Sequence, residues 1–311
     1  MKKIAFVFPG QGSQSVGMLD AWAENSAVQH AIQVANEALG QDLSALIATG
    51  PEADLNLTTN TQPAMLVAAV AMFNAWVEAG GALPDMVAGH SLGEYSALTA
   101  SGVFHLADAV KLVRVRANAM QDAVPVGVGA MAAVLNLDDV QIRQVCAEAA
   151  QGQVVEPVNF NAPGQIVIAG HKEAVERACE LAKAAGARRA VLLPVSAPFH
   201  SSLLEPAAEV LAEALKHVEL DAPRIPVINN VDVEWPDDTI DIKSALARQA
   251  CHPVRWVETI EKMRALGVTH IVECGPGKVL SGLVKRIDKE MIILSINDPD
   301  SLEQALQSLQ D

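Results

Sequence analysis

The sequence is poor in cysteine and in basic residues. The cysteines form no C-x-x-C pair and have no zinc-ligand spacing with a histidine, so we interpret them as free thiols of a reducing cytoplasm and expect neither a metal nor a cofactor. Lys and Arg number 22 against 37 Asp and Glu, and the net charge is −15. No segment interleaves basic with aromatic residues, which argues against a nucleic-acid surface. The four cysteines are Cys146, Cys179, Cys251 and Cys274.

Long hydrophobic runs are also absent. The longest uninterrupted apolar stretch, 63–73, is too short to cross a bilayer. The apolar run in MKKIAFVFPG is too short for a signal peptide and ends at Pro9-Gly10, so we interpret 4–8 as a strand. We therefore expect a cytoplasmic protein with no membrane partner, and we expect a monomer.

The order of predicted elements indicates an α/β protein with an inserted subdomain. Strand and helix alternate up to the short run 86–88, which ends in GHSLG. Residues 125–196 instead read β-α-β-β-α-β, the order of a ferredoxin-like fold, between the turn-rich segments VPVGVG and SAP. We therefore predict a catalytic domain built from 1–124 and 197–311, with 125–196 as a small subdomain.

GHSLG at 89–93 matches the G-x-S-x-G nucleophile elbow. That motif needs a strand, a tight turn and a helix whose amides point back at the reacting centre. The run 86–88 and the helix-forming residues 94–100 provide this context. A serine that merely caps the helix would explain Ser91 but not both glycines. Ser91 is therefore the candidate nucleophile.

FPGQGSQ at 8–14 follows the first strand and is rich in glycine. The spacing of Gly10, Gly12 and Gly17 does not fit G-x-G-x-x-G, and no Lys-Ser/Thr follows, so a nucleotide loop is disfavoured. Such a loop can present a backbone N–H as an oxyanion donor, together with the amide that follows the serine. Gln11 and Leu92 are then the candidate donors, and a purely structural turn is an equal alternative.

Among the eight histidines, His200 has an unusual setting. It follows the strand RRAVLLPV and precedes a helix for which we predict a capping box between Ser202 and Glu205, with Pro206 in the first turn. A helix N-terminus disfavours imidazolium, so the ring would stay neutral and able to accept a proton. A capping histidine without chemical function is an equal alternative.

Arg116 falls on an apolar helical stripe. A cation on a buried face needs a partner, either a structural carboxylate or the anionic group of a substrate. The sequence leaves both open. The stripe consists of Ala109, Leu112, Val113, Ala119, Met120 and Ala123.

Taken together, these motifs resemble the malonyl-CoA:acyl carrier protein transacylase family of bacterial type II fatty-acid synthesis. The resemblance covers nearly the whole chain and is specific, because several long motifs occur in the family's order. They are FPGQGSQ, TQPA at 61–64, GHSLGEYSAL at 89–98, Arg116, NFNAPGQIVIAG at 159–170, the Phe-His of APFH, Q-x-x-x-P-V-R-W at 249–256 and ECGPGKVL at 273–280.

The resemblance implies a hydrolase-like α/β domain with a ferredoxin-like insertion, and a ping-pong transfer of malonyl from malonyl-CoA to acyl carrier protein. It implies that Ser91 is the nucleophile, that His200 is the general base and acid, and that Arg116 binds the malonyl carboxylate. The backbone carbonyl of Gln249 would orient His200 in place of the usual aspartate, and the ring of Phe199 would exclude an α-methyl group. Gln11 and Leu92 would form the oxyanion hole.

Other interpretations remain at this stage. A serine esterase or thioesterase would need a triad acid and a late histidine such as His252 or His270, and would leave Arg116 unexplained. His252 also departs from the small polar residue that the family pattern has before this proline. A free-standing malonyl transferase that serves a polyketide synthase would have the same site.

An acidic carrier protein would need a local basic patch to dock on this acidic chain. Two clusters are candidates, Lys278 with Lys285 and Arg286, and Arg188 with Arg189. Each could equally be a solvated face.

Overall fold

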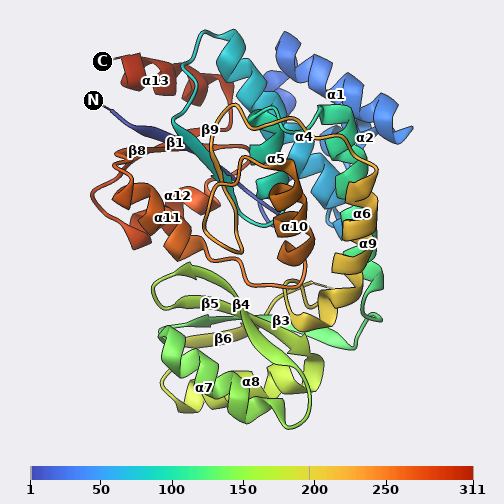
Figure 1. Ribbon diagram of the computed structural model, residues 1–311, viewed down its shortest axis with the longest axis vertical. Helices are drawn as coiled ribbons and strands as arrows, with labels where there is room; N and C mark the ends of the chain where they lie inside the picture. The colour runs from blue at the N-terminus through green and yellow to red at the C-terminus, as the bar shows by residue number, and fades with distance from the viewer. Residues whose placement is uncertain (1, 196, 311) are drawn as a thin grey trace.

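The computed structural model describes residues 2–195 and 197–310, which form two β-sheets in separate parts of the molecule (Figure 1). The larger sheet has the order β7-β2-β1-β8-β9, and every neighbouring pair is parallel. This confirms the α/β class. Its strands are β1 (Ile4–Phe8), β2 (Met86–Gly89), β7 (Val227–Ile228), β8 (His270–Cys274) and β9 (Ile292–Ile296).

Both faces of the larger sheet are covered by helices. Side chains alternate along β1, so Phe6 and Phe8 pack on one side and Ala5 and Val7 on the other. Helices α1, α4, α5, α6 and α9 share a core with the phenylalanines, while α11 and α12 pack on the opposite face. The helices are α1 (Ser26–Leu39), α2 (Leu43–Thr49), α3 (Glu52–Leu55), α4 (Thr58–Glu78), α5 (Gly93–Ala100), α6 (Leu106–Asp122), α9 (Glu205–Lys216), α10 (Thr239–Gln249), α11 (Trp256–Ala265), α12 (Val279–Ile287) and α13 (Pro299–Gln310), with short 3-10 turns η1 (Asp20–Trp22) and η2 (Ser202–Leu204).

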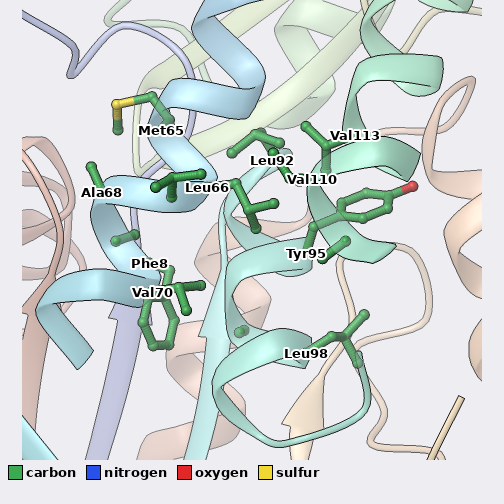
Figure 2. Close-up of a cluster of buried hydrophobic side chains, with 14 of the residues drawn as sticks. Phe8, Met65, Leu66, Ala68, Val70, Leu92, Tyr95, Leu98, Val110 and Val113 are labelled. Atoms are coloured by element: carbon green, nitrogen blue, oxygen red, sulfur yellow. The ribbon is translucent and has the colours of Figure 1, made fainter. Parts of the chain in front are cut away.

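Helix α4 is the centre of the main core. Its Met65, Leu66 and Val70 belong to one buried cluster with Phe8 of β1 and with apolar side chains of α5 and α6, and Figure 2 shows Val70 beside Phe8. Because α4 is buried on nearly all sides, it provides a rigid support for the segment that carries the GHSLG turn.

The smaller sheet is antiparallel, with the order β4-β5-β3-β6. Two helices pack on it around a separate apolar core, and this order is that of a ferredoxin-like fold, as the β-α-β-β-α-β pattern predicts. Residue 196, the predicted end of the small subdomain, lies outside the described residues. The elements are β3 (Gly129–Leu135), α7 (Asp139–Ala150), β4 (Val155–Ala162), β5 (Gln165–His171), α8 (Lys172–Ala184) and β6 (Arg189–Leu192).

The edge strand β7 is short although the segment PVINNV at 226–231 is largely apolar. Only β7 (Val227–Ile228) pairs with β2, because Asn229 and Asn230 leave the sheet. The Asn230 side chain instead donates to the Gly89 carbonyl at 2.7 Å. After Ile228 the chain therefore contacts the GHSLG turn through a side chain of Asn230 and no longer through strand pairing. Within 2–195 and 197–310, no helix has both the length and the apolarity to cross a membrane.

Candidate active site

Ser91 lies at the turn between β2 and α5, in a left-handed backbone conformation with φ 53°. A non-glycine residue rarely adopts this region, and strain of this kind is typical of a nucleophile elbow. A Cβ built on Gly89 would lie 1.8 Å from the carbonyl oxygen of Gly93, so the turn requires glycine there. The predicted strand, turn and helix around Ser91 are confirmed.

Asn230 stabilises the nucleophile elbow through two hydrogen bonds of its side chain. The Ser91 amide donates to Asn230 Oδ1 at 2.8 Å, while Asn230 Nδ2 donates to the Gly89 carbonyl at 2.7 Å. These two bonds tie the strained residue to the end of β7. The sequence analysis missed Asn230, and its only signal there was an Asn-Asn pair inside an apolar strand pattern.

The His200 ring lies between Ser91 and Gln249. Its Nε2 is 2.7 Å from Ser91 Oγ, and its Nδ1 is 2.7 Å from the backbone carbonyl oxygen of Gln249. A carbonyl oxygen only accepts, so Nδ1 carries the proton and Nε2 is free to accept the serine proton. The backbone of His200 is also in the left-handed conformation, with φ 64°. The three residues form a hydrogen-bonded series that can move a proton from the hydroxyl.

The local setting of His200 differs from the prediction in one respect. Helix α9 begins at Glu205 with Leu204 as N-cap and no side-chain cap, so the Ser202–Glu205 capping box is wrong. The Ser202 amide and hydroxyl donate instead to the Glu156 carboxylate of β4, at 2.8 and 2.7 Å. Burial, followed by the neighbouring Arg116 cation, lowers the pKa of His200 to about 3. The ring is neutral, as expected, but for a different reason.

Gln249, the last residue of α10, is fully buried and contacts several groups of the site. Its backbone carbonyl faces His200, and its side-chain Oε1 accepts from Arg116 Nη2 at 2.9 Å. Its Nε2 donates to the Ser91 carbonyl at 3.0 Å and to the Glu94 carboxylate at 2.9 Å. The resemblance had implied only the backbone contact.

Arg116 of α6 is 1% exposed, which confirms its place on the buried stripe. Its Nη1 donates to Gln62 Oε1 at 2.6 Å, and its Nη2 also reaches Ser91 Oγ at 3.2 Å. The guanidinium carbon lies 5.2 Å from the centre of the Tyr95 ring. Its Nε has no hydrogen-bond partner in the described part of the chain.

No carboxylate among the described residues forms an ion pair with Arg116. The structural carboxylate that the sequence left open is therefore not seen, and a buried cation faces the nucleophile.

A pocket of about 230 Å³ opens over these groups. Ser91, His200 and Arg116 line it, as do Gln11, Leu92 and Phe199. The other side of the pocket comes from the smaller sheet and from the segment that follows it, with Met131, Asn159, Asn161, Val167, Leu193 and Val195. The pocket thus lies where the two parts of the molecule meet.

The proposed oxyanion donors are close to the nucleophile. A Cβ built on Gly10 would lie 2.6 Å from the His90 carbonyl oxygen and 3.7 Å from the Leu92 amide nitrogen, so the loop after β1 packs directly on the elbow. The backbone N–H groups of Gln11 and Leu92 donate to no acceptor within 2–195 and 197–310, whereas the Gln11 side chain donates through Nε2 to Thr58 Oγ1 at 3.1 Å. Both amides are therefore available to a ligand.

The late histidines of the esterase interpretation are not part of the pocket. His252 is exposed and contacts the Arg248 carbonyl, while His270 of β8 contacts Thr269. The residues of the described chain also contain no cluster of three or more His, Cys, Asp or Glu that could hold a metal.

Comparison with known proteins gives the family. The model of the acyl transferase domain matches residues 5–293. The malonyl CoA-acyl carrier protein transacylase of Escherichia coli K12 is 54% identical over 308 residues, which are 99% of this chain and 100% of that protein.

Solved structures agree. An acyl-carrier-protein S-malonyltransferase from Burkholderia pseudomallei is 60% identical, with a TM-score of 0.97 and coverage of 98% of this chain and 99% of that one. A malonyl-transacylase solved in complex with a type II polyketide acyl-carrier protein is 50% identical, with a TM-score of 0.97 and coverage of 99% and 100%. The chain therefore belongs to the acyl transferase domain family, among the malonyl CoA-acyl carrier protein transacylases.

Proposed function

We propose that this protein transfers the malonyl group of malonyl-CoA to the phosphopantetheine thiol of an acyl carrier protein, through a malonyl ester on Ser91. The buried Arg116 guanidinium carries this proposal. It lies 3.2 Å from Ser91 Oγ and has no carboxylate partner among the described residues, so an acyl group that itself ends in a carboxylate completes the site. A general esterase has no use for this cation.

In the first half-reaction, Ser91 Oγ attacks the thioester carbonyl and passes its proton to His200 Nε2. The amides of Gln11 and Leu92 stabilise the tetrahedral oxyanion. When the intermediate collapses, the C–S bond breaks and the departing CoA sulfur takes the proton from His200. The malonyl carboxylate pairs with Arg116 throughout.

In the second half-reaction, the carrier-protein thiol gives its proton to His200 and attacks the ester carbonyl. The C–O bond breaks, and Ser91 regains the proton. The partner of His200 Nδ1 is a carbonyl, which stabilises imidazolium less than a carboxylate does. His200 is thus a weak base, which suffices for a readily ionised thiol and activates water poorly.

The same proposal includes the division of the chain into a catalytic domain, 1–124 and 197–311, and a small subdomain, 125–196. We also propose that the protein acts as a monomer in the cytoplasm and does not bind nucleic acid, in keeping with its net charge of −15. Fatty-acid synthesis is the process that it would supply. The 50% identity to a malonyl-transacylase complexed with a polyketide carrier protein favours a second acceptor of that type.

The test is to incubate the protein with radiolabelled malonyl-CoA, with and without a carrier protein that bears phosphopantetheine. We expect a base-labile label on the protein, which moves to the carrier protein when that is added. Ser91→Ala should carry no label. Ser96→Ala, which removes another hydroxyl of the same segment that lacks a hydrogen-bond partner in the described chain, should be labelled normally. A labelled Ser91→Ala variant would contradict the assignment.

A further inference from the structure

Glu94 is a buried carboxylate next to the active site, and the proposed reaction does not use it. It lies in the first turn of α5, three residues after Ser91, and is 2% exposed. Its Oε2 accepts from the backbone N–H of Asn230 and from Gln249 Nε2, both at 2.9 Å. No Lys, Arg or His of the described residues forms an ion pair with it. A buried anion with neutral partners is costly, so it needs an explanation.

The contacts of Glu94 fix the orientation of the Gln249 amide. An ionised carboxylate only accepts, so Glu94, together with the Ser91 carbonyl at 3.0 Å, holds the NH₂ end of Gln249 and turns its Oε1 toward Arg116, which donates to it at 2.9 Å. The second contact, to the Asn230 amide, holds the residue whose Oδ1 accepts from the Ser91 amide at 2.8 Å. One carboxylate oxygen thus fixes the supports of both the cation and the nucleophile.

The side-chain amide of Gln249 lies between Glu94 and Arg116 and is hydrogen-bonded to both. A direct ion pair would occupy the guanidinium, whereas the intervening Gln249 leaves Arg116 open toward the pocket while an opposite charge remains near it. Burial raises the pKa of Glu94 to about 7, although the hydrogen bonds from Asn230 and Gln249 and the charge of Arg116 lower it.

We propose that Glu94 is a positioning residue of the transfer site: through Gln249 and Asn230 it fixes Arg116 and Ser91, and its charge sets how strongly the site favours an anionic acyl group over a neutral one. This inference rests on the proposed function, because it takes Arg116 as the group that meets the acyl carboxylate.

The sign of the pH effect follows from the charge. Below pH about 7 Glu94 is protonated and Arg116 faces no protein anion, so an anionic acyl group gains most from the cation. Above pH about 7 ionised Glu94 offsets part of the Arg116 field, and the advantage shrinks. The ratio of kcat/KM for malonyl-CoA to that for acetyl-CoA should therefore fall as the pH rises through this value.

Other charged groups near Glu94 do not titrate in this range. Arg116 on α6 and Arg248 on α10 remain cations, and the pKa of Asp232 after β7 is lowered by Arg248. Burial raises the pKa of Tyr95 on α5 to about 12. Burial also lowers the pKa values of His90 and His200 in the turn and loop, so both rings are neutral. Shared acid and base steps cancel in the ratio of the two substrates.

The test compares Glu94→Gln, Glu94→Ala and the control Ser96→Ala, a buried site on the same helix whose hydroxyl has no partner within the described residues. Acylation by malonyl-CoA and by acetyl-CoA is measured from roughly pH 6 to 8, with the thermal midpoint of each variant. Glu94→Gln keeps an acceptor for both donors, so its midpoint and acetyl transfer should be retained. Its malonyl-to-acetyl ratio should be about fivefold higher than that of the parent at high pH and should no longer vary with pH. Glu94→Ala should lose malonyl transfer by a factor on the order of 10², because the clamp and the elbow lose their support.

A Glu94→Gln ratio with the same value and pH dependence as in the parent would overturn the inference, as would a Glu94→Ala variant that loses only thermal stability. If Glu94→Ala does not fold, Glu94→Gln decides. A parent enzyme that acquires no malonyl label on Ser91 would instead refute the proposed function, so the two failures are distinguishable.

Discussion

The two parts of the molecule contribute differently to the pocket. Every group in the proton-transfer series comes from the larger part: Ser91 from the end of β2, His200 from the loop before α9, and Gln249 from α10, with Arg116 from α6 beside them. The smaller sheet contributes wall residues such as Met131, Asn159 and Val167. The larger part would thus perform the chemistry, and the smaller part would give the pocket its shape.

This division has a physical reason. Reacting groups must be held within a fraction of an ångström, which side chains on buried strands and helices achieve. The larger sheet is covered on both faces, whereas the smaller sheet has helices around one core and turns its other residues toward the pocket. Substitutions in the larger part should therefore change the rate or the recognition of the acyl carboxylate, and those in the smaller part or at the boundary should change selectivity for the shape of the acyl group.

The largest expected effect is that of His200→Ala. Without the ring, Ser91 has no acceptor for its proton, so acylation by malonyl-CoA should slow by a factor on the order of 10² to 10⁴. Rapid-mixing measurement of CoA release gives this rate. Since the ring is buried and its backbone is strained, the thermal midpoint is measured alongside. Unchanged acylation at neutral pH would mean that another residue is the base, and would contradict the proton-transfer role assigned to His200 of the larger part.

Arg116→Ala should separate the two kinds of acyl group. It removes a charge-assisted contact worth on the order of 2–5 kcal/mol in a desolvated pocket, so malonyl transfer should fall steeply. Acetyl transfer should be equal or better, because a buried cation no longer disfavours apolar atoms. The measurement is the malonyl-to-acetyl ratio of kcat/KM together with the thermal midpoint.

If Arg116 is mainly structural, the same variant should lower the midpoint and depress both substrates alike. Gln62, which accepts from Nη1 at 2.6 Å, offers a matched control. Gln62→Leu leaves the guanidinium in place but unpaired on that side, so it should reduce malonyl transfer less than Arg116→Ala does.

The sequence was informative where the chemistry is local. The elbow at 89–93 and the cation Arg116 on an apolar stripe follow from spacing within one turn or one helix, and the β-α-β-β-α-β order follows from consecutive elements of one continuous segment. The supports of the site could not be predicted in this way, because Glu94 and Asn230 meet across 136 positions of the chain. The capping box predicted at the start of α9 was wrong for a related reason. Ser202 donates to the carboxylate of Glu156 in the smaller sheet, which is distant in sequence, and does not cap its own helix.

Phe199→Ser tests the role of shape at the boundary between the two parts. Phe199 is buried and packs in the same cluster as Met131 and Val167 of the smaller sheet, where it lines the pocket. Its ring should crowd an α-methyl group, so the parent should prefer malonyl-CoA over methylmalonyl-CoA by roughly tenfold, and the variant should narrow this gap. Phe199→Leu, which keeps an apolar side chain, guards against a loss of stability. Equal use of both substrates by the parent would refute the steric role.

The smallest expected effect concerns the docking of the carrier protein, for which each part of the molecule offers a basic cluster. In the larger part, exposed Lys278 immediately precedes α12, whose Val279 and Leu283 line the pocket, and Lys285 is exposed on the same helix. In the smaller part, Arg188 and Arg189 are exposed at the start of β6.

Proximity to the pocket favours the cluster in the larger part, since the phosphopantetheine thiol must reach Ser91. Reversing Lys278 and Lys285 to Glu should raise the KM for an acidic carrier protein a few-fold and flatten its dependence on salt, because exposed charges act mainly on encounter. Transfer to free pantetheine should be unchanged. Arg286 is left in place because its Nη1 donates to Gln165 Oε1 of β5 at 2.7 Å and so links the two parts. The matched variant reverses Arg188 and Arg189. If only this second variant raises the KM, the smaller part recruits the partner as well as shaping the pocket, and the division between the two parts must be redrawn.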